Sequence, residues 1–241
     1  MYSSSASRRE ITLTLPVLHP GQVTVANEAR RWNVVDCGRR WGKTLFGADL
    51  LANKAIDGHP VGWFAPSYRL LADAWRYVSE LLEPIVARSR ADEHRIELLG
   101  GGSIDFFSLD NPDQALGRKY ALIVVDEAAV APGLDTAWPK IIRPTLVDLR
   151  GSAWFLSTPR GHNYFWRLWE LGQDAGQEQW RSWQQPTSAN PYIPAEEIEA
   201  ARAELPEQVF AQEFLAHFTE DAGSVFRGVY DACTSEPADA A

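Results

Sequence analysis

The chain has 241 residues, of which 45% are hydrophobic and 23% are charged, and its formal net charge is −9 at pH 7. This length allows one large domain or two small ones, and the composition is typical of a globular protein that buries a core. The negative net charge argues against nonspecific nucleic-acid binding by the chain as a whole, so a DNA contact would need a local patch, another domain or another subunit.

The sequence contains no apolar run long enough to cross a bilayer, and residues 1–16 lack the apolar core of a secretory signal. We therefore expect a cytosolic protein without membrane contact. Cys37 and Cys233 show no metal-ligand spacing, and we expect both to remain thiols in a reducing compartment. Cys37 is interpreted as a small loop residue rather than a nucleophile.

Apolar runs and helical periodicity predict alternating strands and helices along the chain. The predicted strands are, in chain order, 32–37, 61–66, 95–99, 103–109, 121–129, 152–159 and 180–186, with a hairpin turn at Gly100–Gly102. The predicted helices are 42–58 with a stop at Gly58, 67–86 with Ser67 as the N-cap, 136–151 interrupted by Pro139 and Pro144, 161–172, and 194–218. This alternation favours the α/β class, with a mainly parallel sheet covered by helices on both faces.

The segment CGRRWGKT (37–44) matches a phosphate-binding loop except at its first position, where Cys37 replaces glycine. Gly42, Lys43 and Thr44 stand in the required order, and Gly38 is expected to supply part of the lost backbone freedom. A strand precedes this loop and a helix follows it, and the free N–H groups and dipole at a helix N-terminus favour phosphate. A chance GKT in a solvated turn is the alternative, and the order of strand, loop and helix disfavours it.

Within this interpretation the charged and hydroxyl side chains of the loop have separate roles. Lys43 neutralises the β- and γ-phosphates of ATP, and Thr44 offers its hydroxyl to Mg²⁺. Arg39 and Arg40 add positive charge where the phosphates lie.

Two acids follow the apolar strand ALIVV (121–125) at its carboxyl end, which faces the ligand crevice in open α/β sheets. Asp126 is placed to hold Mg²⁺ through water, and Glu127 is placed to polarise an attacking water, which suits hydrolysis better than transfer to a substrate. A surface acid pair at a helix N-terminus is the alternative. The predicted strand 152–159 similarly carries Ser157 and Thr158 near its carboxyl end, and these hydroxyls either reach the γ-phosphate or form a turn that ends the strand.

CGRRWGKT, VVDEAA and STPRG, at these separations, resemble the ATPase domain of the large terminase subunit of tailed bacteriophages, the motor that packages DNA into procapsids. LHPGQ (18–22) is similar to the adenine-recognition segment of that family, with Gln22 as the candidate base contact. The resemblance covers roughly residues 18–226, and the altered first glycine is also tolerated in the family.

The resemblance implies a P-loop NTPase fold of the RecA-like (ASCE) type with a small C-terminal helical lid, and it implies ATP and Mg²⁺ as cofactors. Glu127 is then the catalytic carboxylate, Thr44 and Asp126 hold the metal, and Ser157 and Thr158 couple hydrolysis to movement. The nucleotide-binding set is Gln22, Gly38, Arg39, Arg40, Trp41, Gly42, Lys43 and Thr44.

The same resemblance implies partners and a division of the chain. The partners are double-stranded viral DNA, a portal protein, a small terminase subunit and further copies of the chain in a ring, all in the cytoplasm of a bacterial host. The predicted units are a flexible segment (1–17), the ATPase core (18–190), a helical lid or linker (191–226) and a truncated linker (227–241). The family usually continues into an RNase H-like nuclease domain, so we expect an isolated ATPase domain without nuclease activity.

The loop QALGRKYA (114–121) departs from the family pattern, in which an arginine precedes the glycine and acts on the ATP of a neighbouring subunit. Leu116 occupies that place here, and Arg118 follows Gly117. Arg118 is the candidate arginine finger, with a solvated loop or a finger from elsewhere as the alternatives. A finger contributes about 10³-fold or more in rate.

Three other functions compete with the packaging motor. A helicase-like translocase needs a second RecA-like lobe, and the residues after Trp180 leave no room for one. A small-molecule P-loop kinase needs an acceptor pocket and a lid with arginines, and the DE pair and STPRG argue against it. The third alternative is a catalytically weak assembly module, and no feature of the sequence argues against it.

Overall fold

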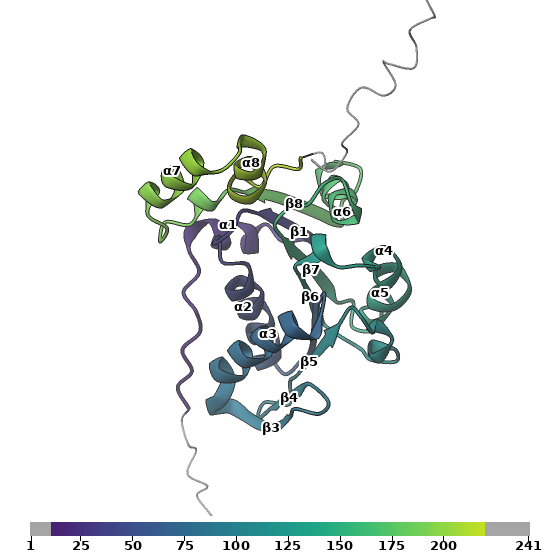
Figure 1. Cartoon of the computed structure of the whole chain (residues 1–241). Helices are drawn as coiled ribbons and strands as arrows, with labels where there is room; N and C mark the ends of the chain where they lie inside the picture. Colours follow the sequence, from purple (N-terminus) through teal and green to yellow (C-terminus); the bar gives the residue numbers. More distant parts are fainter. Residues whose placement is uncertain (1–10, 220–241) are drawn as a thin grey trace, which may run out of the picture.

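The computed structural model describes residues 11–219 (Figure 1). Its strands are β1 (Trp32–Cys37), β2 (Pro60–Ala65), β3 (Val86–Arg90), β4 (Arg95–Leu98), β5 (Ser103–Ser108), β6 (Leu122–Asp126), β7 (Ser152–Ser157) and β8 (Trp180–Gln185). Its helices are α1 (Pro20–Asn27), α2 (Lys43–Ile56), α3 (Tyr68–Leu82), α4 (Leu134–Ala137), α5 (Arg143–Thr145), α6 (Tyr164–Gln173), α7 (Ala195–Glu204) and α8 (Glu207–Leu215).

All eight strands form one sheet in the order β3-β4-β5-β2-β6-β7-β1-β8. The strands from β5 to β8 in that order pair in parallel, whereas β4 runs antiparallel to both β3 and β5. Parallel pairing brings the carboxyl ends of β1, β6 and β7 to the same edge, since Asp36 lies beside Ser157 and Asp126 beside Leu156. The loops that follow these three strands therefore meet.

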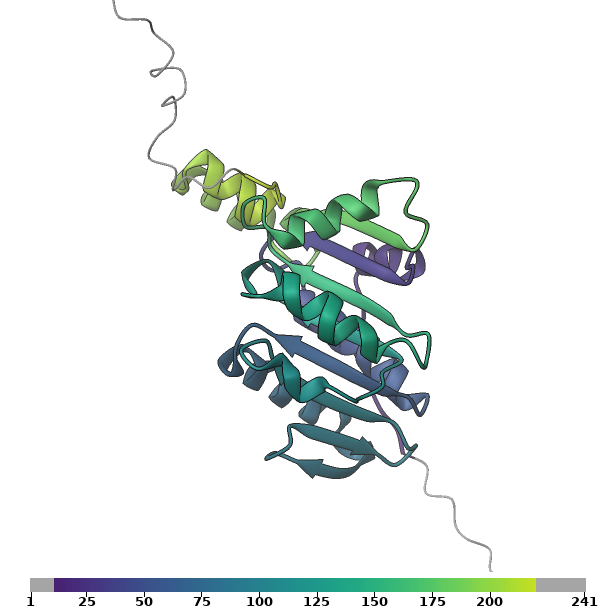
Figure 2. The same ribbon diagram turned by 90° about the vertical axis from the view of Figure 1, so that its right-hand side faces the viewer.

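Helices cover both faces of the sheet, as predicted. α1, α2 and α3 pack on one face, where Val25, Leu51 and Leu71 join a continuous core. α4, α5 and α6 cover the other face, and Figure 2, turned toward it, shows them lying across the strands. Both faces of the central strands are buried, which explains why LIVV is a continuous apolar run and why WNVVDC shows no alternation of apolar and exposed polar residues.

The predicted elements agree with the structure with a few exceptions. β3 was missed because its sequence, VARSR, is mostly exposed and carries none of the apolar alternation that marks a half-buried strand. α3 ends at Leu82 and a 3₁₀ turn containing Pro84 follows, so the predicted helix 67–86 was too long. Ser67 is the N-cap residue of α3, but its side chain makes no capping hydrogen bond.

A second missed element is α1, for which the sequence does contain a signal. Pro20 occupies the first helical turn, and His19 and Gln22 form a reciprocal capping box around it. Pro139 and Pro144 do not separate their segment into distinct helices, because a π-helical turn (Trp138–Ile142) joins α4 to α5.

α7 and α8 lie beside β8 and the loop after β1, at one end of the sheet (Figure 1). The predicted helical segment 194–218 is divided between them, and Phe210 of α8 is buried and stacks on Phe214. Residues 11–19 form no helix or strand. Within residues 11–219, no helix combines the length and the apolar character needed to span a bilayer.

Some of the predictions concern residues outside the described part of the chain. Residues 1–10 of the predicted flexible segment, residues 220–226 of the predicted lid, the linker 227–241 and Cys233 all lie there. The boundary at residue 190 and the expected lack of nuclease activity stay predictions.

Candidate functional site

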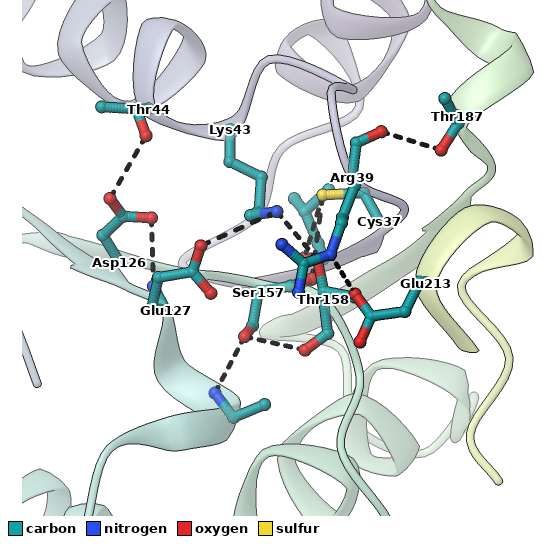
Figure 3. Close-up of polar contacts among 12 residues, drawn as sticks. Cys37, Arg39, Lys43, Thr44, Asp126, Glu127, Ser157, Thr158, Thr187 and Glu213 are labelled. Atoms are coloured by element: carbon teal, nitrogen blue, oxygen red, sulfur yellow. Dashed lines mark hydrogen bonds and ion pairs between the residues drawn. The ribbon is translucent and has the colours of Figure 1, made fainter. Parts of the chain in front are cut away.

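The candidate site lies where the loops after β1, β6 and β7 meet at one edge of the sheet (Figure 3). The loop after β1 leads into α2, whose N-cap residue, Gly42, provides no side-chain cap. The first N–H groups of this 14-residue helix are therefore available to a ligand, and the helix dipole favours an anion there. The structure thus brings the predicted loop and the predicted acids together.

The first position of the loop does not require glycine. Cys37 is the last residue of β1 and is completely buried, and its φ is not positive, so a Cβ atom fits there. Burial raises the pKa of its thiol, which agrees with the prediction that it is not a nucleophile.

Gly38 has a different role from the one predicted. Its φ is not positive either, so the prediction that it supplies lost backbone freedom is wrong. A Cβ atom on Gly38 would lie 2.5 Å from the Thr187 hydroxyl oxygen and 2.6 Å from the Phe214 carbonyl oxygen. Gly38 is therefore needed for the close approach of the segment before α7 and of α8. The residues of the loop with left-handed backbone are Arg40, at φ 64°, and Gly42, at φ 98°.

Lys43 projects from the start of α2 between the other two loops. Its Nζ donates to the Thr158 hydroxyl at 2.9 Å and lies 3.8 Å from Glu127 Oε1 (Figure 3). Its side chain is only 10% exposed, so a charge partner is needed there. A γ-phosphate entering the site would meet this ammonium group.

Thr44 and Asp126 form the candidate metal site. The Thr44 hydroxyl donates to Asp126 Oδ2 at 3.5 Å, and Asp126 Oδ1 accepts from the Glu127 amide at 3.0 Å. Burial raises the pKa of the Asp126 carboxyl to about 7, and the neighbouring Glu127 adds to the rise. A divalent cation would relieve this unfavourable charge. Mg²⁺ usually takes one or two protein oxygens together with phosphates and water, so a hydroxyl and a carboxylate fit it. Among residues 11–219, no group of three His, Cys, Asp or Glu side chains forms a self-sufficient metal site.

Glu127 stands in left-handed backbone geometry, at φ 50°, directly after β6. This conformation is unfavourable for a residue with a side chain and is typical of functional positions. The Glu127 side chain is one-third exposed and lines the cavity beside Lys43.

Ser157 and Thr158 hold the third loop in place. The Ser157 hydroxyl accepts from the Ala129 amide at 3.0 Å and donates to the Thr158 carbonyl at 2.9 Å. Asn163, which caps α6, donates to the Ala129 carbonyl at 2.7 Å. These bonds tie the loop after β7 to the loop that carries Glu127. Asn163 was not predicted to belong to the site, although an Asn before a helical run is a recognisable cap.

Gln22 and Trp41 lie behind the loop. Gln22 is 2% exposed, and its amide nitrogen donates to the Gly42 carbonyl at 3.1 Å. The structure therefore places its side chain against the loop, and the contact with a base stays a prediction. The Trp41 ring is fully buried and packs edge-to-face on His19 and Phe46, so only its main chain faces the site.

A cavity of about 370 Å³ opens in front of these loops. Two charged residues that line it, Arg160 and Glu213, were not assigned to the site from the sequence. Arg160 follows the predicted STP motif directly, whereas Glu213 lies on α8, far along the chain. The Arg39 guanidinium forms an ion pair with Glu213 beside this cavity (Figure 3). Lys43 and three arginines thus line the cavity, which suits it to a polyphosphate. Its lining residues are Arg39, Arg40, Lys43, Leu70, Glu127, Val130, Thr158, Pro159, Arg160 and Glu213.

Asp36 is the buried carboxyl of β1, and it does not line the cavity. Gln184 donates to its Oδ2 at 3.4 Å, while its Oδ1 has no partner among the described residues. Burial raises the pKa of Asp36 to about 8, an effect that the Gln184 bond and the Lys43 charge only partly oppose.

Arg118 does not line this cavity. It borders a separate surface hollow of about 380 Å³ together with Tyr68, His94 and Gln114. Leu116 is 58% exposed, and Lys119 pairs with Asp148 at 2.6 Å. The loop thus presents Arg118 at the surface, away from the phosphate loop of its own subunit.

Comparison with known proteins adds independent findings. The family described as "Terminase large subunit, T4likevirus-type, N-terminal" matches residues 36–229. The large terminase subunit of Escherichia phage T5 is 31% identical over 213 residues, which cover 85% of this chain and 49% of that protein. The one of Thermus phage G20c is 29% identical over 143 residues, which cover 51% of this chain and 27% of that protein. The chain therefore spans about half the length of the T5 relative and about a quarter of the G20c relative.

Solved structures show the same fold. The ATPase domain of the Thermus phage P74-26 large terminase superposes with a TM-score of 0.69 at 22% identity, covering 83% of this chain and 94% of that one. The large terminase of another thermophilic bacteriophage, solved in complex with ADP, has the same TM-score at 14% identity and covers 84% of this chain and 54% of that one. The chain thus has the P-loop NTPase fold of RecA-like type that these ATPase domains share.

Proposed function

This chain belongs to the terminase large subunit family, and on that basis we propose that it binds ATP and hydrolyses it to drive the packaging of viral double-stranded DNA. The observation that carries the proposal is the convergence on one cavity of Lys43, Glu127 and Thr158, which come from three separate loops. This is the set of groups that phosphoanhydride hydrolysis requires: a cation for the phosphates, a carboxylate for the water and a hydroxyl near the reacting phosphate.

The residues divide the reaction between them. The N-terminus of α2 and the Lys43 ammonium bind the β- and γ-phosphates, and Arg160 adds charge to the cavity. Thr44 and Asp126 would hold Mg²⁺, which when bound neutralises charge on the phosphate oxygens. Glu127 orients and polarises the attacking water. The Lys43 ammonium lies 3.8 Å from Glu127 Oε1, so a γ-phosphate that binds this ammonium competes with the carboxylate and frees it for water.

Contacts also connect the site of the γ-phosphate to the loop after β7. The Thr158 hydroxyl, which accepts from Lys43, can donate to an oxygen of the γ-phosphate. Ser157 links the loop after β7 to the main chain after Glu127, because its hydroxyl accepts from the Ala129 amide. Release of phosphate would therefore shift the two loops together, which supports the coupling role of Ser157 and Thr158.

The partners in this proposal are those of a packaging complex: double-stranded DNA, a portal protein, a small terminase subunit and further copies of the chain in a ring, in the cytoplasm of the bacterial host. Arg118 is the proposed trans finger, because it is exposed on a surface loop and does not line the cavity of its own chain. A positive charge from a neighbour would stabilise the developing charge on the phosphates.

The test is ATP hydrolysis measured against protein concentration, with and without double-stranded DNA. We expect a rate that rises faster than linearly with concentration, because neighbours complete the sites. Lys43→Ala and Glu127→Ala should each abolish the activity, while Lys54→Ala, a lysine of the same helix outside the cavity, should leave it unchanged. Failure of the wild-type chain to bind ATP would refute the phosphate-loop assignment.

Arg118→Ala tests the finger separately. If Arg118 acts in trans, the variant binds ATP normally, loses the concentration-dependent part of the rate and regains activity when mixed with Glu127→Ala. This complementation occurs because each mutant then supplies the part that the other lacks. Normal cooperative hydrolysis by Arg118→Ala would exclude it as the finger.

A further inference from the structure

Side chains from other segments of the chain form hydrogen bonds with main-chain carbonyl groups of the phosphate loop. Thr187 donates its hydroxyl to the Arg39 carbonyl at 2.8 Å (Figure 3), and Asn190 donates its amide to the Arg40 carbonyl at 2.7 Å. The next two carbonyls are held by the segment before β1: His19 Nε2 lies 2.9 Å from the Trp41 carbonyl oxygen, and Gln22 donates to that of Gly42 at 3.1 Å. Four successive carbonyls thus have side-chain partners.

These bonds fix the direction of the peptide groups. A trans peptide points its carbonyl and its N–H group to opposite sides, so the contacts to the Arg39 and Trp41 carbonyls also fix the directions of the Arg40 and Gly42 amides. The Trp41 amide, which follows the Arg40 carbonyl, donates to the Gly38 carbonyl at 3.3 Å within the loop. In the described part of the chain, the Arg40 and Gly42 amides donate to no protein acceptor, whereas those of Gly38 and Arg39 donate to Gln185 and Glu213. The Arg40 and Gly42 amides are therefore available to donate to a phosphate.

The loop needs such external support because part of it is strained. Arg40 has a φ of 64°, a left-handed conformation that is unfavourable for a residue with a Cβ atom. Nothing in the chemistry of an arginine favours this geometry, in contrast to glycine at the same kind of turn. Asn190 holds the carbonyl of this residue, so its bond opposes relaxation of the loop to an ordinary conformation.

We propose that Thr187 and Asn190 are positioning residues for nucleotide binding, which preorganise the phosphate loop by holding the carbonyls of Arg39 and Arg40. This inference rests on the proposed function, since it names residues that serve the same site. Neither side chain lines the cavity, so both act through the loop. They lie after β8 and before α7, far from the loop in sequence, and Thr187 is also the residue against which Gly38 packs.

The variants are chosen to remove one hydrogen bond each. Thr187→Val deletes the hydroxyl at nearly constant volume, Thr187→Ser retains it, and Asn190→Ala deletes the amide. Two matched controls lose a bond of the same kind elsewhere: Thr145→Val loses a 2.7 Å bond to the Ile142 carbonyl, and Asn53→Ala loses a 2.9 Å bond to the Asp49 carbonyl.

The affinities of each variant for MgADP and for magnesium pyrophosphate are measured by calorimetry, and the melting temperature is measured without ligand. We expect each of Thr187→Val and Asn190→Ala to weaken both affinities about fivefold, as the loss of one ordinary hydrogen bond would. The two controls should leave both affinities unchanged, and Thr187→Ser should restore them. Equal losses for ADP and pyrophosphate would locate the effect at the phosphates, and a purely structural role would lower the melting temperature without changing affinity.

The outcomes are distinguishable. If the wild-type chain binds neither probe, or if Lys43→Ala binds both normally, the proposed function fails and this inference fails with it. If the wild-type chain binds in a Lys43-dependent way while Thr187→Val and Asn190→Ala bind equally well, the function stands and the positioning role is overturned. If Thr187→Val does not fold, Asn190→Ala decides the question alone, because Asn190 is only partly buried.

Discussion

The buried carboxyl of Asp36 makes the stability of this protein depend on pH in an unusual direction. Asp36 is completely buried in β1, and its pKa is raised from 3.8 to about 8. Between these values the folded state retains a proton that the unfolded state has lost, so the free energy of unfolding falls as pH rises. The decline is about 1.4 kcal/mol per pH unit and reaches on the order of 5 kcal/mol by pH 8. That is a large share of the roughly 5–15 kcal/mol by which a domain is usually stable.

Asp36→Asn removes this dependence, because an amide keeps the shape of the protonated carboxyl and does not ionise. The Asn oxygen can still accept the bond from Gln184. We expect the variant to match the wild type near pH 4 and to exceed its stability progressively up to about pH 8. Urea unfolding at pH 5, 6, 7 and 8 measures the difference between the two proteins, which cancels contributions from other groups such as Asp126.

The reasoning would be refuted by a variant that is less stable than the wild type by the same amount at every pH. That result would mean that the folded protein holds Asp36 as a satisfied carboxylate. Asp57→Asn is the matched control for the exchange of an aspartate for an asparagine, since Asp57 is exposed at the end of α2.

Three further predictions follow from the loop and the acids around it. Glu127→Gln should retain MgADP affinity and lose about 100-fold or more in the rate of ATP hydrolysis, measured by phosphate release, because the amide cannot polarise water. A rate near that of the wild type would show that another group orients the water. Gly38→Ala should destabilise the protein by about 2 kcal/mol in urea unfolding, because its Cβ atom collides with Thr187 and with the main chain of α8. Gly176→Ala is the control, because its Cβ atom meets only a side chain. Equal stability of the two variants would contradict this explanation. Cys37 should resist iodoacetamide at pH 8 in the native protein and react only in urea, because burial raises the pKa of its thiol and excludes the reagent. Alkylation of Cys37 in the native protein, detected by peptide mapping, would show that β1 opens.

The sequence by itself determined the alternation of strands and helices in the central part of the chain and the ends of the strands that carry chemistry. Burial on both faces makes the central strands continuous apolar runs, and parallel strands present their carboxyl ends at one edge. Lys43, Asp126 and Thr158 could therefore be predicted to meet, since each follows such a run closely. The short edge strand β3 was beyond this reasoning, because an exposed strand carries no apolar pattern.

The tertiary structure alone decided how the phosphate loop is supported. Glycine is dispensable at position 37 because the φ angle of Cys37 is not positive. Glycine is required at position 38 because Thr187 approaches closely there. The sequence of the loop shows neither feature. The prediction that Gln22 contacts a base stays a prediction, and only the tertiary structure shows that its amide donates to the Gly42 carbonyl. The partners of Arg39 lie 148 and 174 residues away along the chain. Local patterns fix how a segment folds, whereas hydrogen bonds between distant segments depend on the packing of the whole chain, which no local pattern encodes.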